Sequence, residues 1–273
     1  MVKSFNLVEF YIKDVNFPNV RPDDAHKYNF GTLFVCGGEE NYRGAALLSI
    51  EAALKTGIGV VYGLFHGSIS DEVLKNFPEV ICLDSVNQMK NIINNESTIV
   101  AGPGTSKLFK NKDLINIISS HKKTSVLDAA FIQAVKERKF ITPPIITPHE
   151  GEAAKLLGCT PKEIKNNRER SIKQISKSFS TITVLKGKDT LICDCNTIFK
   201  CKHGSNNLAK AGSGDILAGL IGSLLAQGLS SVESCKTAVA LHGFCGEQFQ
   251  NRNYVAKDLI EQIAKQRFSL SSI

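Results

Sequence analysis

Residues 203–221 read HGSNNLAKAGSGDILAGLI, a turn of small residues that runs straight into a strongly apolar segment. The apolar segment predicts a buried helix that begins near Gly214. The glycines leave the backbone amides of Ala211 to Gly214 unshielded, and these amides lie at the positive end of the helix dipole. We therefore expect an anion site at this turn, most naturally for a phosphate group.

Asp215 falls in the first turn of the predicted helix. An acidic residue there complements the helix dipole, so a purely structural role also accounts for it. A carboxylate beside an anion site equally suits phosphoryl transfer, in which the amides neutralise the migrating group and the carboxylate accepts the proton of the attacking hydroxyl. The spacing of the glycines matches neither the Walker A loop nor the dinucleotide fingerprint Gly-x-Gly-x-x-Gly.

Short apolar runs alternate with helical patterns through the first half of the chain. This alternation predicts an α/β fold with a mostly parallel sheet. Several runs lead directly into Gly37, Gly102, Asp128 or the Thr-Pro-His triplet that ends at His149. Ligands of open parallel sheets sit at the carboxyl ends of the strands, so a site is expected where these runs end. The runs cover residues 31–36, 60–64, 79–83, 97–101, 125–127 and 145–146.

The second half of the chain changes its pattern. A capping box at Thr160 and Glu163, with Pro161 between them, predicts a helix that reaches about residue 177. Three β-rich runs then predict a small antiparallel meander beside the parallel sheet, and three helices finish the chain. The runs are residues 181–185, 190–194 and 198–202, and the helices are residues 214–227, 231–248 and 257–266. Without a linker or an internal repeat, residues 1–273 are expected to form one domain, with residues 1–30 as an extension packed on it.

Composition excludes several classes of protein. The net charge is +7, the lysines are scattered and Trp is absent, so a nucleic-acid footprint is not supported. The longest apolar stretch, residues 216–226, is too short to span a membrane, and the N-terminus lacks the apolar core of a secretory signal. The eight cysteines are expected to be reduced structural thiols of a cytoplasmic protein. A zinc site at Cys193, Cys195, Cys201 and His203 is the less favoured alternative, because no C-x₂-C pair is present.

The segment KAGSGDILAG, residues 210–219, resembles the G-[TS]-G-D signature of ribokinase-like kinases. That signature alone indicates only the superfamily. Further blocks in the same order, spread over residues 31–246, resemble the NAD(P)H-hydrate dehydratases of that superfamily, and TPHEGE with AGPG narrows the resemblance most. The blocks are GG at 37–38, YRGA at 42–45, AALKTGIG at 52–59, AGPG at 101–104, TPHEGE at 147–152, LKGKDT at 185–190 and LHG at 241–243.

The resemblance implies a ribokinase-like fold, with helices on both faces of the sheet, and a repair activity. The substrate would be the (S) form of the 6-hydrate of NADH or NADPH, which no longer carries hydride. Phosphoryl transfer to the 6-hydroxyl creates a good leaving group, and elimination of phosphate restores the reduced dinucleotide. The expected enzyme is an ADP-dependent (S)-NAD(P)H-hydrate dehydratase that converts ADP to AMP, although ATP is the donor in eukaryotic-type members. Mg²⁺ is expected to screen the phosphates, and no all-protein metal site is expected.

The same resemblance assigns roles to residues. Asp215 would accept the proton of the substrate hydroxyl as the phosphoryl bond forms, because a carboxylate of ordinary pKa is too weak to remove it in advance. The amides of Gly212 and Gly214 would form the anion hole. The substrate residues would be Ala45, Gly104, His149 and Asp215, and the nucleotide residues Lys186, Gly187, Lys188, Asp189, Thr190 and Gly214.

For several residues the sequence allows two different roles. His149 after Thr-Pro also suits a helix start, and Lys186 also suits a solvated hairpin. Glu152 would organise Mg²⁺ or complement a helix dipole, and Lys210 would add a cation near phosphate. His242 lies in an apolar helical pattern and is expected to pack in the core.

The chain departs from the family pattern at three places. Ala130 stands where the family often has a second aspartate after Asp128, Thr105-Ser106 replaces Leu-Gly, and Lys210-Ala211 replaces Thr-Gly. The dehydratase-like blocks start at residue 31, so we expect no fused epimerase domain and an NAD(P)H-hydrate epimerase on a separate chain as functional partner. Family members are often homo-oligomers.

Two other functions compete with the dehydratase. One is a ribokinase-like kinase of a vitamin-precursor alcohol, such as a hydroxymethylpyrimidine or a hydroxyethylthiazole, which would share the phosphoryl site. The other is a nucleotide-binding regulator with an inactive site, against which the intact Asp215 and its glycines argue. Product analysis separates them, since a kinase leaves a phosphorylated product and a dehydratase releases phosphate.

Overall fold

One sheet runs through the part of the chain that the computed structural model describes, residues 6–18, 22, 24–65, 69–106, 110–249 and 253–270. Its strands are β1 (Asn6–Phe10), β2 (Thr32–Gly37), β3 (Val60–Phe65), β4 (Ile81–Leu83), β5 (Thr98–Ala101), β6 (Val126–Leu127), β7 (Ile145–Ile146), β8 (Ile182–Leu185), β9 (Leu191–Cys193) and β10 (Thr197–Cys201). They lie side by side in the order β1-β10-β9-β8-β7-β6-β5-β2-β3-β4.

The strand directions confirm a mostly parallel sheet with a small antiparallel meander. Only the pairings of β9, with β8 and with β10, are antiparallel among the described strands. The N-terminal strand β1 closes one edge of the sheet by pairing in parallel with β10, where Phe10 lies opposite Cys201.

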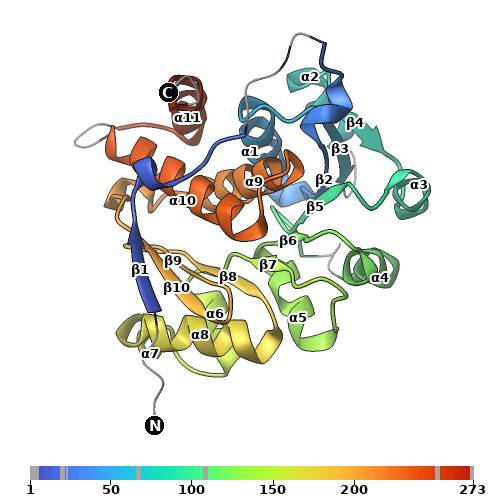
Figure 1. Cartoon of the computed structure of the whole chain (residues 1–273). Coiled ribbons are helices and arrows are strands. Elements are labelled where there is room, and N and C mark those ends of the chain that lie inside the picture. Colours follow the sequence, from blue (N-terminus) through green and yellow to red (C-terminus); the bar gives the residue numbers. More distant parts are fainter. Residues whose placement is uncertain are drawn as a thin grey trace.

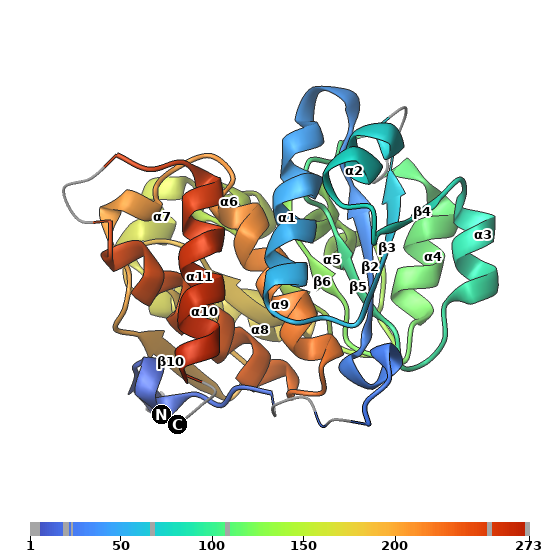
Figure 2. The same ribbon diagram turned by 90° about the horizontal axis from the view of Figure 1, so that it is seen from above.

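Helices cover both faces of the sheet, as expected for a ribokinase-like fold (Figures 1 and 2). The helices are α1 (Arg43–Lys55), α2 (Ser70–Asn76), α3 (Val86–Ile92), α4 (Lys112–Ser120), α5 (Ala134–Glu137), α6 (Glu150–Leu157), α7 (Pro161–Asn166), α8 (Arg168–Phe179), α9 (Ser213–Ala226), α10 (Ser231–Glu247) and α11 (Ala256–Leu270). Buried side chains of α1, α2, α9, α10 and α11 join one apolar cluster, and those of α3 to α8 join a second. The two clusters lie on opposite faces, so most strands are buried on both sides.

The central helix α9 packs closely against α1. Most of its residues are buried, in keeping with its nearly continuous apolar sequence. At Gly219 the backbone of α1 approaches so closely that an added Cβ would lie 2.2 Å from the carbonyl oxygen of Ser49. The absence of a side chain at Gly219 therefore sets the distance between the two helices.

The predicted helix after Thr160 is divided in two. Its capping box forms, because the Thr160 hydroxyl accepts from the Glu163 N–H and the Glu163 carboxylate accepts from the Thr160 N–H. The helix then stops at Asn167, whose backbone angles of φ −138° and ψ 45° are not helical. A new helix, α8, begins at Arg168, so the expectation of one helix to residue 177 was wrong.

The cysteine cluster does not gather around one point. Cys193 in β9 and Cys201 in β10 pack into different apolar clusters, on opposite faces of the sheet. Cys195 lies in the turn between them, and all eight cysteines are free thiols. No helix of the described residues is both long enough and apolar enough to cross a membrane.

Candidate active site

The carboxyl ends of the parallel strands and the beginning of α9 meet at one edge of the sheet. Asp128 follows β6, Thr147 follows β7 and Lys186 follows β8. Gly212 caps α9 with a φ of +90°, a conformation that glycine adopts without strain. The turn and helix expected at residues 211–227 therefore form, with Asp215 in the first turn of α9.

Lys186 is the centre of this arrangement. Its Nζ lies 2.9 Å from Asp128 Oδ1 and 3.9 Å from Glu152 Oε2. It also lies against the backbone of Gly214, because an added Cβ there would be 3.2 Å from Nζ. Burial alone would lower the pKa of Lys186, but the Asp128 and Glu152 carboxylates outweigh burial and raise that pKa. A permanent positive charge therefore sits beside the first turn of α9.

Asp128 is a site residue that sequence reasoning did not assign. Its side chain is 4% exposed, and its Oδ1 accepts from Lys186 and, at 2.6 Å, from the Thr147 hydroxyl. The backbone of Gly102 approaches it so closely that an added Cβ would lie 1.9 Å from the Asp128 carbonyl oxygen. The available signal was its place directly after a buried strand, the same signal that drew attention to His149.

Asp215 has a strongly perturbed acidity. Burial and the Asp128 carboxylate together raise its pKa to about 7, against the opposing effect of Lys186. A carboxylate of ordinary pKa, as expected from the sequence, would accept the hydroxyl proton only as the phosphoryl bond forms. In the folded protein Asp215 is a stronger base that is still half ionised near neutral pH.

His149 caps helix α6. Its Nδ1 accepts from the backbone N–H of Gly151 at 2.9 Å and of Glu152 at 3.3 Å, and the Glu152 carboxylate accepts from the His149 N–H at 2.8 Å. This reciprocal pairing matches the helix-start alternative for His149. The imidazole is nevertheless 61% exposed and lines the pocket described next, so the cap leaves one edge of the ring available to a ligand.

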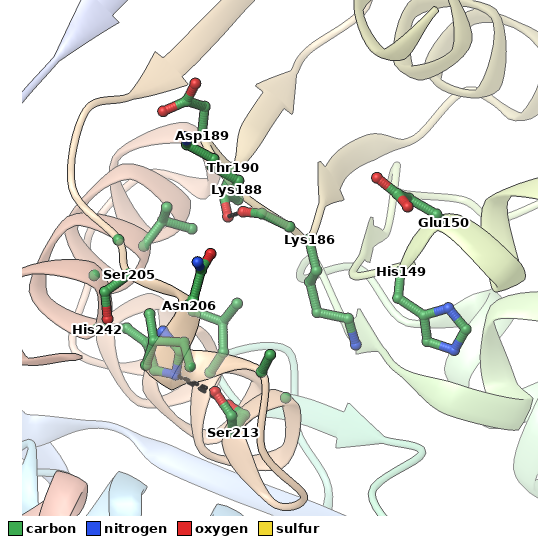
Figure 3. Close-up of a pocket in the computed structure, with 18 of the residues that line it drawn as sticks. His149, Glu150, Lys186, Lys188, Asp189, Thr190, Ser205, Asn206, Ser213 and His242 are labelled. Carbon is green, nitrogen blue, oxygen red and sulfur yellow. Dashed lines mark hydrogen bonds between the residues drawn. The ribbon is translucent and has the colours of Figure 1, made fainter. Parts of the chain in front are cut away.

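A pocket of about 930 Å³ opens beside Lys186 (Figure 3). All six residues assigned to the nucleotide line it: Lys186, Gly187, Lys188, Asp189, Thr190 and Gly214. Asp215 and Gly212 are not among its lining residues. Neither are Ala45 and Gly104, which lie against each other, since an added Cβ on Gly104 would be 2.9 Å from the Ala45 Cβ.

Helix α1 connects Ala45 and Gly104 to the turn of residues 211–214 that leads into α9, here called the anion turn. Ala45 lies in the first turn of α1, and an added Cβ on Gly212 would be 2.5 Å from Leu48 Cδ1 of the same helix. Of the residues assigned to the hydrated dinucleotide, Ala45 and Gly104 therefore approach the beginning of α9 from the side of α1, whereas His149 lines the nucleotide pocket.

Arg168 and His242 are two pocket residues that the sequence did not identify as functional. Arg168 donates to Glu150 Oε1 at 2.8 Å and to the carbonyls of Leu185 and Lys186, which holds the end of β8 in place. No motif in its helical segment indicated this role. His242 is buried, as expected of a packing residue, but it also contacts the anion turn through Ser213.

Lys210 interacts with the protein in this structure. Its Nζ donates to the Tyr254 carbonyl and lies 4.3 Å from the centroid of the Tyr254 ring. It still lines the pocket. The Lys210 ammonium is therefore hydrogen-bonded at the wall of the pocket, and the side chain still borders the cavity.

The fold and the pocket define a ribokinase-like protein. An ADP/ATP-dependent NAD(P)H-hydrate dehydratase from Bacillus subtilis, co-crystallised with ATP/Mg²⁺, has a similar structure, with a TM-score of 0.83 and 25% sequence identity over 95% of this chain and 96% of that one. A hydroxyethylthiazole kinase from Pyrococcus horikoshii shares the fold, with a TM-score of 0.60 and 12% identity over 88% of this chain and 89% of that one.

The chain belongs to the NAD(P)H-hydrate dehydratase family, whose model matches residues 33–267. An ADP-dependent (S)-NAD(P)H-hydrate dehydratase from Neisseria meningitidis is 34% identical over 261 residues, which cover 90% of this chain and 87% of the relative. A bifunctional NAD(P)H-hydrate repair enzyme from Coxiella burnetii is 32% identical over 89% of this chain, which spans 51% of that longer protein.

Proposed function

We propose that this protein is an ADP-dependent (S)-NAD(P)H-hydrate dehydratase, a hydro-lyase that restores NADH or NADPH from the (S) 6-hydrate. In the first step the 6-hydroxyl oxygen attacks the β-phosphorus of ADP, the hydroxyl proton passes to Asp215, and AMP leaves. In the second step the bond between C6 and oxygen breaks, a proton leaves C5, and inorganic phosphate is released. The reduced nicotinamide ring is thereby regenerated.

The observation that carries this proposal is the environment of Asp215. A half-buried carboxylate with a pKa of about 7 sits in the first turn of α9, next to the glycines of the anion turn and near the Lys186 ammonium. A general base is most effective when its pKa is close to the working pH. The amides of Gly212 and Gly214, at the positive end of the helix dipole, would stabilise the charge on the migrating phosphoryl group.

The nucleotide would occupy the pocket beside Lys186. Lys186 and the turn of Gly187, Lys188, Asp189 and Thr190 supply cations, amides and hydroxyls along one wall, and Gly214 borders the same cavity. Lys186 is held rigidly by Asp128, so its charge is positioned for a phosphate before the ligand arrives. The hydrated dinucleotide would bind at Asp215, with Ala45 and Gly104 on the side of helix α1 and His149 at the border of the nucleotide pocket.

Mg²⁺ would enter with the phosphates. Among the described residues no group of three or more His, Cys, Asp or Glu side chains is arranged to hold a metal ion, and the Asp128 and Glu152 carboxylates already neutralise Lys186. A phosphate-bound ion would retain several waters, with Glu152, at 15% exposure, as the carboxylate open to it. The ion would neutralise the phosphoryl charge.

The proposal also covers domain organisation, cellular compartment, oligomeric state and functional partner. We propose a single ribokinase-like domain that acts in the cytoplasm as a homo-oligomer and depends functionally on an NAD(P)H-hydrate epimerase. The continuous sheet supports the single domain. The free thiols, most of them buried, support a reducing compartment.

The test is an optical assay with purified protein, enzymatically prepared NADH hydrate, Mg²⁺, and ADP or ATP. We expect the reduced-nicotinamide absorbance to return with ADP, together with free phosphate. Asp215→Asn should lose at least about 10³-fold in turnover while it still binds nucleotide, whereas Asp258→Asn, on the surface of α11, should retain full activity. A stable phosphorylated hydrate, or phosphorylation of a thiazole or pyrimidine alcohol without NADH recovery, would instead identify a kinase.

A further inference from the structure

Ser213 and His242 form a hydrogen-bonded pair at the wall of the nucleotide pocket (Figure 3). Ser213 is the first residue of α9, in the anion turn, and His242 lies in α10. Each residue is 8% exposed, and both line the cavity. His242 Nε2 lies 3.1 Å from the Ser213 hydroxyl oxygen and 3.1 Å from the Ser213 carbonyl oxygen.

The carbonyl contact determines where the imidazole proton is. A carbonyl oxygen only accepts hydrogen bonds, so Nε2 must carry a hydrogen and donate it. An unprotonated Nε2 would place two lone pairs against each other at 3.1 Å. Burial lowers the pKa of His242 to about 4, so the ring is neutral at pH 7, with its single proton on Nε2.

The position of this proton orients the Ser213 hydroxyl. Because Nε2–H is shared between the carbonyl and the hydroxyl oxygen, Ser213 Oγ is an acceptor in the pair. Its own hydrogen is then available to donate elsewhere, and Ser213 lines the pocket next to Gly214, against which the Lys186 ammonium lies. An acceptor with a high negative charge at this place is a phosphate oxygen.

We propose that His242 is a positioning residue that fixes the Ser213 hydroxyl as a hydrogen-bond donor to a phosphate of the bound nucleotide. This inference rests on the proposed function, since it deepens the nucleotide site assigned above. Ser213 adds a directional side-chain donor to the anion turn. His242 borders the same pocket, but in this proposal its effect on the nucleotide passes through Ser213.

The test measures nucleotide binding by calorimetry with the full chain, ADP and Mg²⁺, without any hydrate. Ser213→Ala removes the donor and is expected to weaken ADP binding about tenfold or more. Ser213→Thr keeps the hydroxyl and should bind within about threefold of the wild type. Adenosine, which has no phosphate, should bind Ser213→Ala as well as it binds the wild type. Thermal midpoints verify that each variant is folded.

His242 is tested by rescue and by a double-variant cycle. His242→Leu should weaken ADP binding by a factor similar to Ser213→Ala, whereas His242→Gln should restore it, because a glutamine amide N–H can replace Nε2–H. The variant with both Ser213→Ala and His242→Leu should bind ADP no more weakly than Ser213→Ala alone, as expected when one residue acts only through the other.

Three results would overturn the inference and leave the proposed function intact: unchanged ADP binding by Ser213→Ala, additive losses in the double variant, or no rescue by His242→Gln. Additive losses would mean that His242 acts by packing. Absence of ADP binding by the wild-type protein would overturn the proposed function as well.

Discussion

At the scale of single residues, the chemistry depends on how three acidic groups and one lysine share a small buried volume. Lys186 is paired with Asp128 and is close to Glu152, so its ammonium is charged and held in place before a nucleotide binds. Asp215 lies near the same groups, and burial together with the Asp128 carboxylate raises its pKa more than Lys186 lowers it. Asp128 therefore positions Lys186, while Asp215 keeps a raised pKa and can act as a base.

The raised pKa of Asp215 predicts the acidic limb of the pH profile. Asp215 must be ionised to accept a proton, so kcat/KM should be constant above pH 7 and fall about tenfold per pH unit below it. The measurement is kcat/KM for NADH hydrate between pH 5.5 and 8.5 at saturating ADP. A profile that stays flat down to pH 5.5, as a carboxylate of ordinary pKa near 4 would give, would contradict this role of Asp215.

The matched variant for this profile is Asp128→Asn. It removes the carboxylate that raises the pKa of Asp215. It also leaves Lys186 without its Asp128 partner, and the Lys186 charge lowers the pKa of Asp215. Both changes act in the same direction, so the acidic limb should move to lower pH while the maximal rate falls. An unchanged limb would show that Asp128 does not control the acidity of Asp215.

The same shift makes a prediction about stability. The folded-state pKa of Asp215 lies above that of the unfolded chain, so protonation stabilises the fold below pH 4, and this stabilisation is lost as the pH rises through about 7. Asp215→Asn removes the cost of ionising the buried group. Its free energy of unfolding should exceed that of the wild type by about 1–3 kcal/mol at pH 8 and by much less at pH 5. Denaturant unfolding at the two pH values checks this, and equal differences would refute it.

At the residue scale, some of the site residues could be predicted from the sequence and others could not. The motif around Gly212 to Asp215 and the turn after Lys186 were identifiable because both are local. Asp128 was not assigned, because its importance comes from contacts with Thr147 and Lys186, 19 and 58 residues away. His242 was taken for a packing residue for the same reason, since its partner Ser213 lies 29 residues earlier.

At the scale of elements, the site depends on where α9 begins relative to α1. Gly219 allows α9 to rest on the α1 backbone, and that contact fixes the position of the anion turn about two helical turns earlier. The helix boundaries themselves were largely predictable, because apolar periodicity and glycine stops are local signals. The break at Asn167 was not, because the capping box and polar surface of α7 and α8 read as one continuous helix.

We expect Gly219→Ala to destabilise the protein by about 2 kcal/mol or more. The new methyl would meet the Ser49 carbonyl, and neither backbone can yield without moving a helix. Gly44→Ala is the matched control: Gly44 also lies in a helix, but an added Cβ there meets nothing within 4 Å. It should be neutral or stabilising by up to about 1 kcal/mol. Chemical denaturation compares the two, and equal effects would contradict the close packing of α1 and α9.

At the scale of the whole molecule, the sheet order places the site. Strands β6, β7 and β8 lie side by side in the sheet (Figure 1). Asp128, Thr147 and Lys186 directly follow these three strands, so they emerge next to one another. The parallel sheet and its meander followed from sequence, whereas the pairing of β1 with β10 did not, since two strands about 190 residues apart carry no mutual sequence signal. In the proposed reaction, a kinase fold carries out phosphoryl transfer and an elimination completes it.

The most direct test of phosphoryl transfer to the substrate follows the oxygen of its 6-hydroxyl. NADH hydrate made in ¹⁸O-labelled water carries the label on its 6-hydroxyl, and the wild-type enzyme would be supplied with unlabelled ADP and Mg²⁺. If the phosphoryl group is transferred to that hydroxyl, each NADH recovered releases one phosphate that contains one ¹⁸O atom, seen by mass spectrometry. Recovery of NADH with the label in water, and unlabelled phosphate, would contradict phosphoryl transfer to the substrate.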